Sequence, residues 1–235
     1  MSNASRYLVV LLRALRSSKT QSPKNLEILA QSQSHSEHIR HLSEIVSDPH
    51  IAQALCSPYS KNQDDCFQGI FNTGHGLIQS LFLLREATYP DSLQFSIGIG
   101  DVDNTINPVM ATDIEGSAIE AAQRGLNRAP KSGHYLALSG FSKHLERTLC
   151  PTVALLWATT RSWNLNRLKI LNERLRGESE LSISRQLQIS ERAVYKNIAQ
   201  AQLGQWSDLI LAVEDSFSRL LSTAAPPNSP QISEN

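Results

Sequence analysis

The chain has 235 residues, of which 22 are basic and 22 acidic, so its formal charge at neutral pH is zero. Neutrality excludes a uniformly cationic, histone-like protein but allows one basic module balanced by an acidic one. Apolar residues make up 40% of the chain, enough for a sizeable core, yet no apolar run approaches the roughly 18 residues of a membrane span. The three scattered cysteines favour a reducing cytoplasm, and we expect a cytoplasmic protein without a membrane segment.

The front of the chain alternates between patterns typical of strands and of helices. An apolar run at Tyr7–Leu12 predicts a buried strand leading into Arg13, and residues 25–46 show helical spacing. Residues 54–71 predict a β-hairpin whose turn carries Asp64 and Asp65. A helix at 74–88, a strand at 93–100, a helix at 115–129 and a strand at 133–140 follow. The first six elements predict an α+β fold of the ferredoxin-like βαββαβ type, with an antiparallel sheet and helices on one face.

The pattern is helical throughout from about residue 142. Residues 142–163 predict a connecting helix, with Pro151 as a point of kinking or restart. Further helices are expected within 164–224, and the Pro- and Ser-rich residues 225–235 are expected to be disordered. We therefore predict a domain over 1–141, a connecting helix over 142–163, a helical domain over 164–224 and a tail over 225–235.

The most specific motif is "LSISRQLQISERAVYKNIAQA", residues 181–201. Ile183 and Leu187 give a first helix an apolar stripe, and Ile189 in the turn is expected to point back into the core. Ser190 is placed to cap the second helix by accepting a hydrogen bond from a free backbone N–H. The buried face of that helix is predicted at Val194, Ile198 and Ala201. This arrangement is typical of a helix-turn-helix, whose second helix enters the major groove of DNA.

The residues on or beside the exposed face of the second helix are the candidate DNA contacts: Arg185, Ser190, Glu191, Arg192, Tyr195, Lys196 and Asn197. Arginine, lysine and asparagine can hydrogen-bond to bases or phosphates. Between residues 161 and 206 eight Lys and Arg face four Glu, a net charge of +4, so the rest of the neutral chain carries −4. A basic module suits phosphate contact. A structural bundle with merely solvated charges is the alternative.

One segment of the chain and, separately, most of the chain resemble known families. The segment "NRLKILNERLRGESELSISRQLQISERAVYKNIAQAQL" resembles the helix-turn-helix of sigma-factor region 4. The strand order, together with "DDCFQGIF", "FSIGIGDV" and "EGSAIEAAQRGLNRAPKSGHYLAL", resembles the SatD family over roughly residues 6–205. That family is similar to class III nucleotide cyclases and GGDEF domains followed by a helix-turn-helix, and the resemblance implies this architecture here.

The metal site that the resemblance implies is altered in this chain. In cyclases, one acid after the first strand and one in the hairpin hold divalent metal against nucleotide phosphates. Leu12 and Arg13 stand at the first position, whereas Asp65 keeps the second acid. Phe67 and Gln68 match the hairpin pattern but Cys66 replaces its Glu, and in the later helix Arg124 matches while Glu120 does not. The altered pattern predicts a non-catalytic domain without metal or cofactor.

The cyclase-like domain is then expected to act as a dimerisation scaffold, or as a sensor of a nucleotide or anion in a pocket formed by Arg13, Asp65, Gln68 and Arg124. His35, His38, His41 and His50 lack the partners of a zinc set and are expected on a solvated face.

We predict a homodimeric, DNA-binding transcriptional regulator, since helix-turn-helix proteins usually read two half-sites. Two alternatives stay open. One is a nucleotidyl cyclase-like enzyme with a remodelled metal site built from Asp64, Asp65 and Asp101. The other is a module whose helices bind a protein such as RNA polymerase.

Overall fold

The computed structural model describes residues 6–15, 55–61, 66–90, 92–131, 133 and 135–222. The helix expected at 25–46, the four histidines considered as metal ligands, Asp64, Asp65 and the tail at 225–235 all lie outside the described residues.

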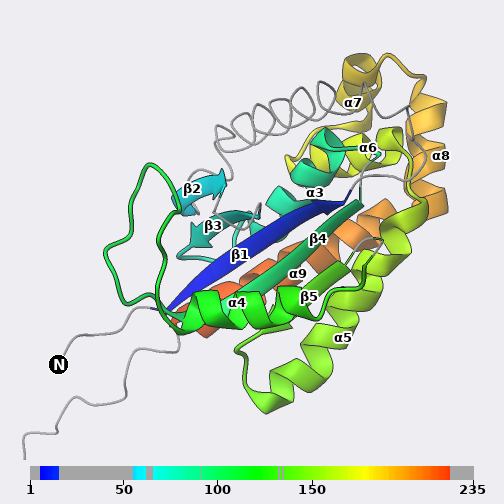
Figure 1. Ribbon diagram of the computed structural model, residues 1–235. Helices are drawn as coiled ribbons and strands as arrows, with labels where there is room; N and C mark the ends of the chain where they lie inside the picture. Colours follow the sequence, from blue (N-terminus) through cyan, green and yellow to red (C-terminus); the bar gives the residue numbers. More distant parts are fainter. Residues whose placement is uncertain are drawn as a thin grey trace, which may run out of the picture.

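The core of the fold is a five-stranded sheet (Figure 1). Its strands are β1 (Arg6–Leu15), β2 (Leu55–Lys61), β3 (Phe67–Phe71), β4 (Ser92–Asp101) and β5 (Tyr135–Ser139), in the order β2-β3-β1-β4-β5. β1 is antiparallel to both of its neighbours, and β2 and β3 form the antiparallel pair predicted as a hairpin. All the strands expected from the sequence are present.

The sheet is mixed, so the prediction of a wholly antiparallel sheet is wrong at one edge. β5 pairs parallel to β4, with Ile97 opposite Leu138. The reason is the helix between them, α4 (Ser117–Asn127), which carries the chain back to the end where β4 began. Parallel neighbours need such a crossover, whereas antiparallel ones can be joined by a short turn.

Helices cover both faces of the sheet, which corrects the expectation of helices on one face (Figure 1). Successive residues of β1 alternate between two apolar cores: Leu8 and Val10 lie in one, Val9 and Leu11 in the other. α4 packs on the second core, and α3 (Leu77–Ala87) packs on the first. A strand buried on both faces reads as a continuous apolar run, as Tyr7–Leu12 does.

Small residues let α4 lie unusually close to β4. A Cβ at Gly98 would lie 2.2 Å from the carbonyl oxygen of Ala118 and 2.4 Å from the backbone nitrogen of Ala122. No side chain fits at these distances, so glycine at this position determines how α4 is seated.

The remaining helices follow the sequence prediction closely. α5 (Lys143–Thr159) continues through Pro151 and is followed by a 3₁₀ turn at Thr160–Ser162. Then come α6 (Leu165–Leu175), α7 (Glu180–Leu187), α8 (Glu191–Ala201) and α9 (Leu203–Ser222). α9 runs back along the sheet on the side opposite α4 (Figure 1). In the described ranges, no helix has the length and apolar character needed to cross a bilayer.

An aromatic cluster joins the back helices to the sheet. The Trp157 ring of α5 lies 5.3 Å from Phe82 on α3 and 5.3 Å from Phe95 on β4, measured between ring centroids. Trp163 and Trp206 lie 5.1 Å apart and both contact Phe82. These contacts fix the bend between α5 and α6 against the sheet, and residues of both halves of the chain belong to one continuous apolar core.

Two buried charged side chains strengthen this junction. The Arg85 guanidinium donates to the hydroxyl and the carbonyl of Thr160, and it lies 5.4 Å from the centroid of the Trp157 ring. The Glu214 carboxylate on α9 accepts hydrogen bonds from the backbone nitrogens of Gly76 (3.0 Å) and Gln79 (2.9 Å). Glu214 therefore caps the start of α3, where a negative charge is favoured by the helix dipole.

Candidate nucleic-acid interface

Capping residues fix the starts of the helices that lead to α8. The Asn164 side chain accepts a hydrogen bond from the backbone nitrogen of Arg167 (2.9 Å) at the start of α6. Ser179 does the same for Ser182 (3.2 Å) at the start of α7. Between them Gly177 has a φ of 83°, a conformation in which glycine avoids the steric cost that a side chain would bring. The chain can therefore turn sharply between α6 and α7.

The turn between α7 and α8 spans Gln188, Ile189 and Ser190. Gln188 adopts the left-handed conformation (φ 53°), and the Ile189 backbone nitrogen donates to the carbonyl of Ser184 (3.1 Å). This is the bonding that commonly closes a helix end. Ile189 packs against the core and the Ser190 hydroxyl accepts from the backbone nitrogen of Ala193 (3.2 Å), both as predicted.

Burial of one side of α8 determines which of its residues face outward. Val194 is fully buried, and Ile198 and Ala201 pack partly buried against the same core. On the opposite side Glu191, Arg192, Tyr195 and Lys196 are exposed, as is Arg185 on α7. Apart from Asn197, the faces of both helices thus agree with those read from the sequence.

Asn197 differs from its predicted exposure. Its side chain is half-buried, and its amide nitrogen donates to the Ala193 carbonyl at 2.9 Å. The residue lies at the boundary of the buried stripe, where a spacing argument cannot separate exposed from half-buried positions.

The basic residues of this region fall into two groups. Arg174 pairs with Glu180 and Arg176 with Glu173, each at 2.7 Å. By contrast, Arg185, Arg192 and Lys196 are exposed and have no carboxylate within ion-pair distance among the residues that the structure describes. Positive charge is therefore available at the outer face of α7 and α8, whereas on α6 it is partly neutralised.

The described residues of the expected ligand pocket differ in burial and in hydrogen-bond or ion-pair partners. Arg13 lies inside β1, opposite Gln94 and half-buried, because the strand continues to Leu15 rather than ending before it as expected. Gln68 is buried and donates to the Ala111 carbonyl. Arg124 lies on the exposed side of α4 and pairs with Glu120 at 3.7 Å. Asp65, the fourth member, is outside the described residues.

Asp101 of the alternative enzyme site lies at the far end of the sheet from Arg13. β1 places Arg6 opposite Asp101 and Arg13 opposite Gln94, so the two ends are separated by roughly 23 Å at ~3.3 Å per residue. Phe67 and Lys61, which flank the hairpin turn, lie at the Arg13 end. Within the described residues there is no group of three or more His, Cys, Asp or Glu placed to hold a metal ion.

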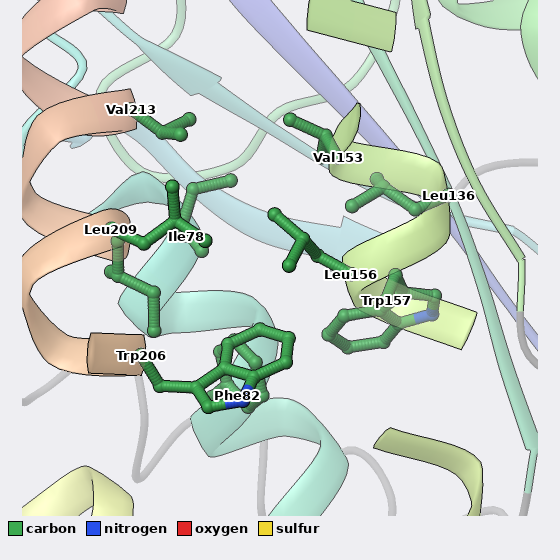
Figure 2. Close-up of a pocket in the computed structure, with 10 residues that line it drawn as sticks. Ile78, Phe82, Leu136, Val153, Leu156, Trp157, Trp206, Leu209 and Val213 are labelled. Carbon is green, nitrogen blue, oxygen red and sulfur yellow. The ribbon is translucent and has the colours of Figure 1, made fainter. Parts of the chain in front are cut away.

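Figure 2 shows an apolar pocket between α5 and α9, with α3 at its floor. Its volume is about 30 Å³, far below the roughly 300–1,000 Å³ of a typical small-molecule pocket. Its lining, which includes Leu156, Trp157, Trp206 and Leu209, offers apolar and aromatic side chains only. A nucleotide would not fit in it, and its lining has no charged side chain to bind an anion.

Arg85 and Glu214 were missed by the sequence reading, although both organise the junction. Burial lowers the pKa of Arg85 to about 10. Burial also raises the pKa of Glu214, against the effect of the backbone N–H groups that favour its charged form. Glu214 lies in line with Ile210, Val213 and Phe217 on the buried stripe of α9. A charged residue within an apolar stripe was the sequence signal that could have identified Glu214 as a buried, hydrogen-bonded carboxylate.

No family model matches the sequence, and a search of curated proteins found no match. The functional assignment therefore rests on the residues and the geometry described above.

Proposed function

We propose that this chain is a DNA-binding transcriptional regulator in which α7 and α8 form a helix-turn-helix and α8 is the reading helix. The observation that carries the proposal is the outer face of these helices. It presents Arg185, Arg192 and Lys196, which have no carboxylate within ion-pair distance among the described residues, against one exposed acid, Glu191, beside a tight, capped turn. Cations held in this way on a fixed helix suit contact with phosphates and base edges.

The sheet half acts as a cyclase-like frame that has lost its chemistry, similar to the SatD family. The position of β1 between β3 and β4, with β2 outside, supports the ferredoxin-like order that this resemblance implies. Arg13, a cation where cyclases hold a metal-binding acid, disfavours metal-assisted phosphoryl chemistry. The sheet half holds two protomers together as a homodimer, so that the two reading helices contact two half-sites of the DNA.

The DNA-binding proposal is tested with fluorescent duplexes from genomic fragments that co-purify with the protein. The wild type is expected to bind them, and the variant combining Arg192→Ala with Lys196→Ala is expected to lose binding. The matched control combines Lys143→Ala with Arg147→Ala, the same charge change at exposed positions of α5. Equal binding by wild type and the α8 variant would refute the assignment of α8.

Calorimetric titration with nucleoside triphosphates and cyclic nucleotides tests the role of the sheet half. Binding heat in the wild type that is lost in the Arg13→Ala variant would favour a nucleotide sensor. No binding heat with any nucleotide would favour a dimerisation scaffold. Conversion of a labelled nucleotide in the presence of Mg²⁺ or Mn²⁺ would instead establish the alternative, a remodelled cyclase.

A further inference from the structure

The exposed face of α8 carries an apolar strip between its cations. The Tyr195 side chain is 55% exposed, and Ala199, four residues later on the same side of the helix, is exposed as well. Arg192 precedes Tyr195 by one turn and Lys196 follows it directly. Glu191, four residues before Tyr195, lies at one end of the strip, so the strip is bordered by two cations and one acid.

Tyr195 makes no hydrogen bond or ring contact with any other residue in the part of the chain that the structure describes. A tyrosine loses few rotamers when it is bound, so an exposed one can bury a large area at low entropic cost. The two cations beside Tyr195, against the single acid Glu191, favour a polyanionic partner over an apolar protein surface.

The charges also indicate which part of a DNA duplex lies against Tyr195. Glu191, at the first position of α8, is exposed, and a carboxylate there repels phosphate. The start of α8 therefore faces base edges, while the longer cationic side chains reach the phosphates on either side. In the major groove the only methyl group on a base edge is the C5-methyl group of thymine.

We infer that Tyr195 and Ala199 read thymine methyl groups in the major groove, so that the site contacted by α8 contains thymines at fixed positions. The inference rests on the proposed function, because it names what the reading helix recognises. Arg185, Arg192 and Lys196 supply affinity through phosphates and tolerate many sequences, whereas the apolar strip supplies the choice of base.

The inference is tested with a duplex that the full-length protein selects from a random-sequence pool, resynthesised with deoxyuridine in place of thymidine. This change removes the methyl group and leaves the hydrogen-bonding edge intact. The wild type is expected to bind the deoxyuridine duplex about fourfold more weakly for each thymine methyl group that α8 reads. Tyr195→Ala is expected to bind the thymidine duplex more weakly and to discriminate less between the two duplexes, whereas Tyr195→Phe should keep the discrimination.

Three outcomes would overturn the inference, and they differ in what else they affect. Equal, salt-sensitive binding of both duplexes by the wild type would refute methyl reading but leave the proposed function standing. A loss of affinity in Tyr195→Phe equal to that in Tyr195→Ala would assign the hydroxyl to a phosphate. Failure to select any duplex would overturn the proposed function as well.

Discussion

Glu214 and Ser190 show how single polar side chains are used where backbone groups lack partners. Both accept hydrogen bonds from N–H groups in the first turn of a helix, where such groups have no partner within the helix. They differ in environment, because Glu214 is 3% exposed whereas Ser190 faces solvent. Burial raises the pKa of the Glu214 carboxyl group, so its contribution to stability depends on pH, whereas that of the Ser190 hydroxyl does not.

The pH dependence of stability tests the burial of Glu214. Its pKa is raised above the ordinary carboxyl value chiefly by burial. The folded state therefore holds the proton more tightly, and the contribution of Glu214 declines as pH rises from the ordinary carboxyl pKa through the raised one. Urea unfolding of wild type and Glu214→Gln across this window should show a steeper decline for the wild type. Parallel curves would show that Glu214 is not buried as described.

The capping contribution of Ser190 at the start of α8 can be compared with Ser142, a serine that also directly precedes a helix. Ser190→Ala should lower the free energy of unfolding by about 1 kcal/mol, because the Ala193 N–H loses its partner. Ser142 precedes α5 but makes no capping hydrogen bond, so Ser142→Ala should change little. Denaturant unfolding measures both, and an equal decrease in the two variants would contradict the capping geometry.

At the scale of elements, the contact between α4 and the sheet depends on the absence of a side chain at Gly98. Gly98→Ala places a methyl group against the backbone of α4, and overpacking of this kind costs about 1–3 kcal/mol. Gly204 on α9 has nothing within 4 Å of an added Cβ, so Gly204→Ala should be neutral or slightly stabilising. Thermal unfolding of the two variants distinguishes them. A Gly98→Ala variant as stable as wild type would show that α4 is seated differently.

Local sequence patterns predicted the helices and strands well, whereas the way these elements pack and pair was harder to predict from the sequence. A continuous apolar run located β1, two short strands around a polar turn located the hairpin, and apolar residues at helical spacing located α8. The parallel β5 and the use of both sheet faces depend on where α4 crosses, which no single segment encodes.

The same division holds for the candidate interface. The Ser190 cap and the exposure of Arg192, Tyr195 and Lys196 could be predicted, since each follows from the helical period of one segment. The half-burial of Asn197 and the ion pair of Arg174 with Glu180 could not. These features depend on the direction in which each side chain points and on residues contributed by neighbouring helices. Arg85 and Glu214 act across residues far apart in the chain, at distances that the sequence does not record.

For the whole molecule, the continuous core suggests that both halves unfold together. Apolar residues from the sheet, α6, α8 and α9 belong to one cluster, and Glu214 ties α9 to α3. Urea unfolding followed by tryptophan fluorescence, which reports the junction, and by far-UV circular dichroism should give coincident transitions. Two separated transitions would show that the helical back half is an independent domain.

The measurement that bears most directly on the account is the salt dependence of DNA binding. Each phosphate contact contributes a slope of about −0.9 to the logarithm of the association constant against the logarithm of salt concentration. The variant lacking Arg192 and Lys196 should therefore show a slope shallower by about 1.8 per protomer than the wild type, while the Lys143/Arg147 control keeps the wild-type slope. A slope unchanged in the α8 variant, or DNA binding without salt dependence, would contradict the claim that α8 is the DNA-reading helix.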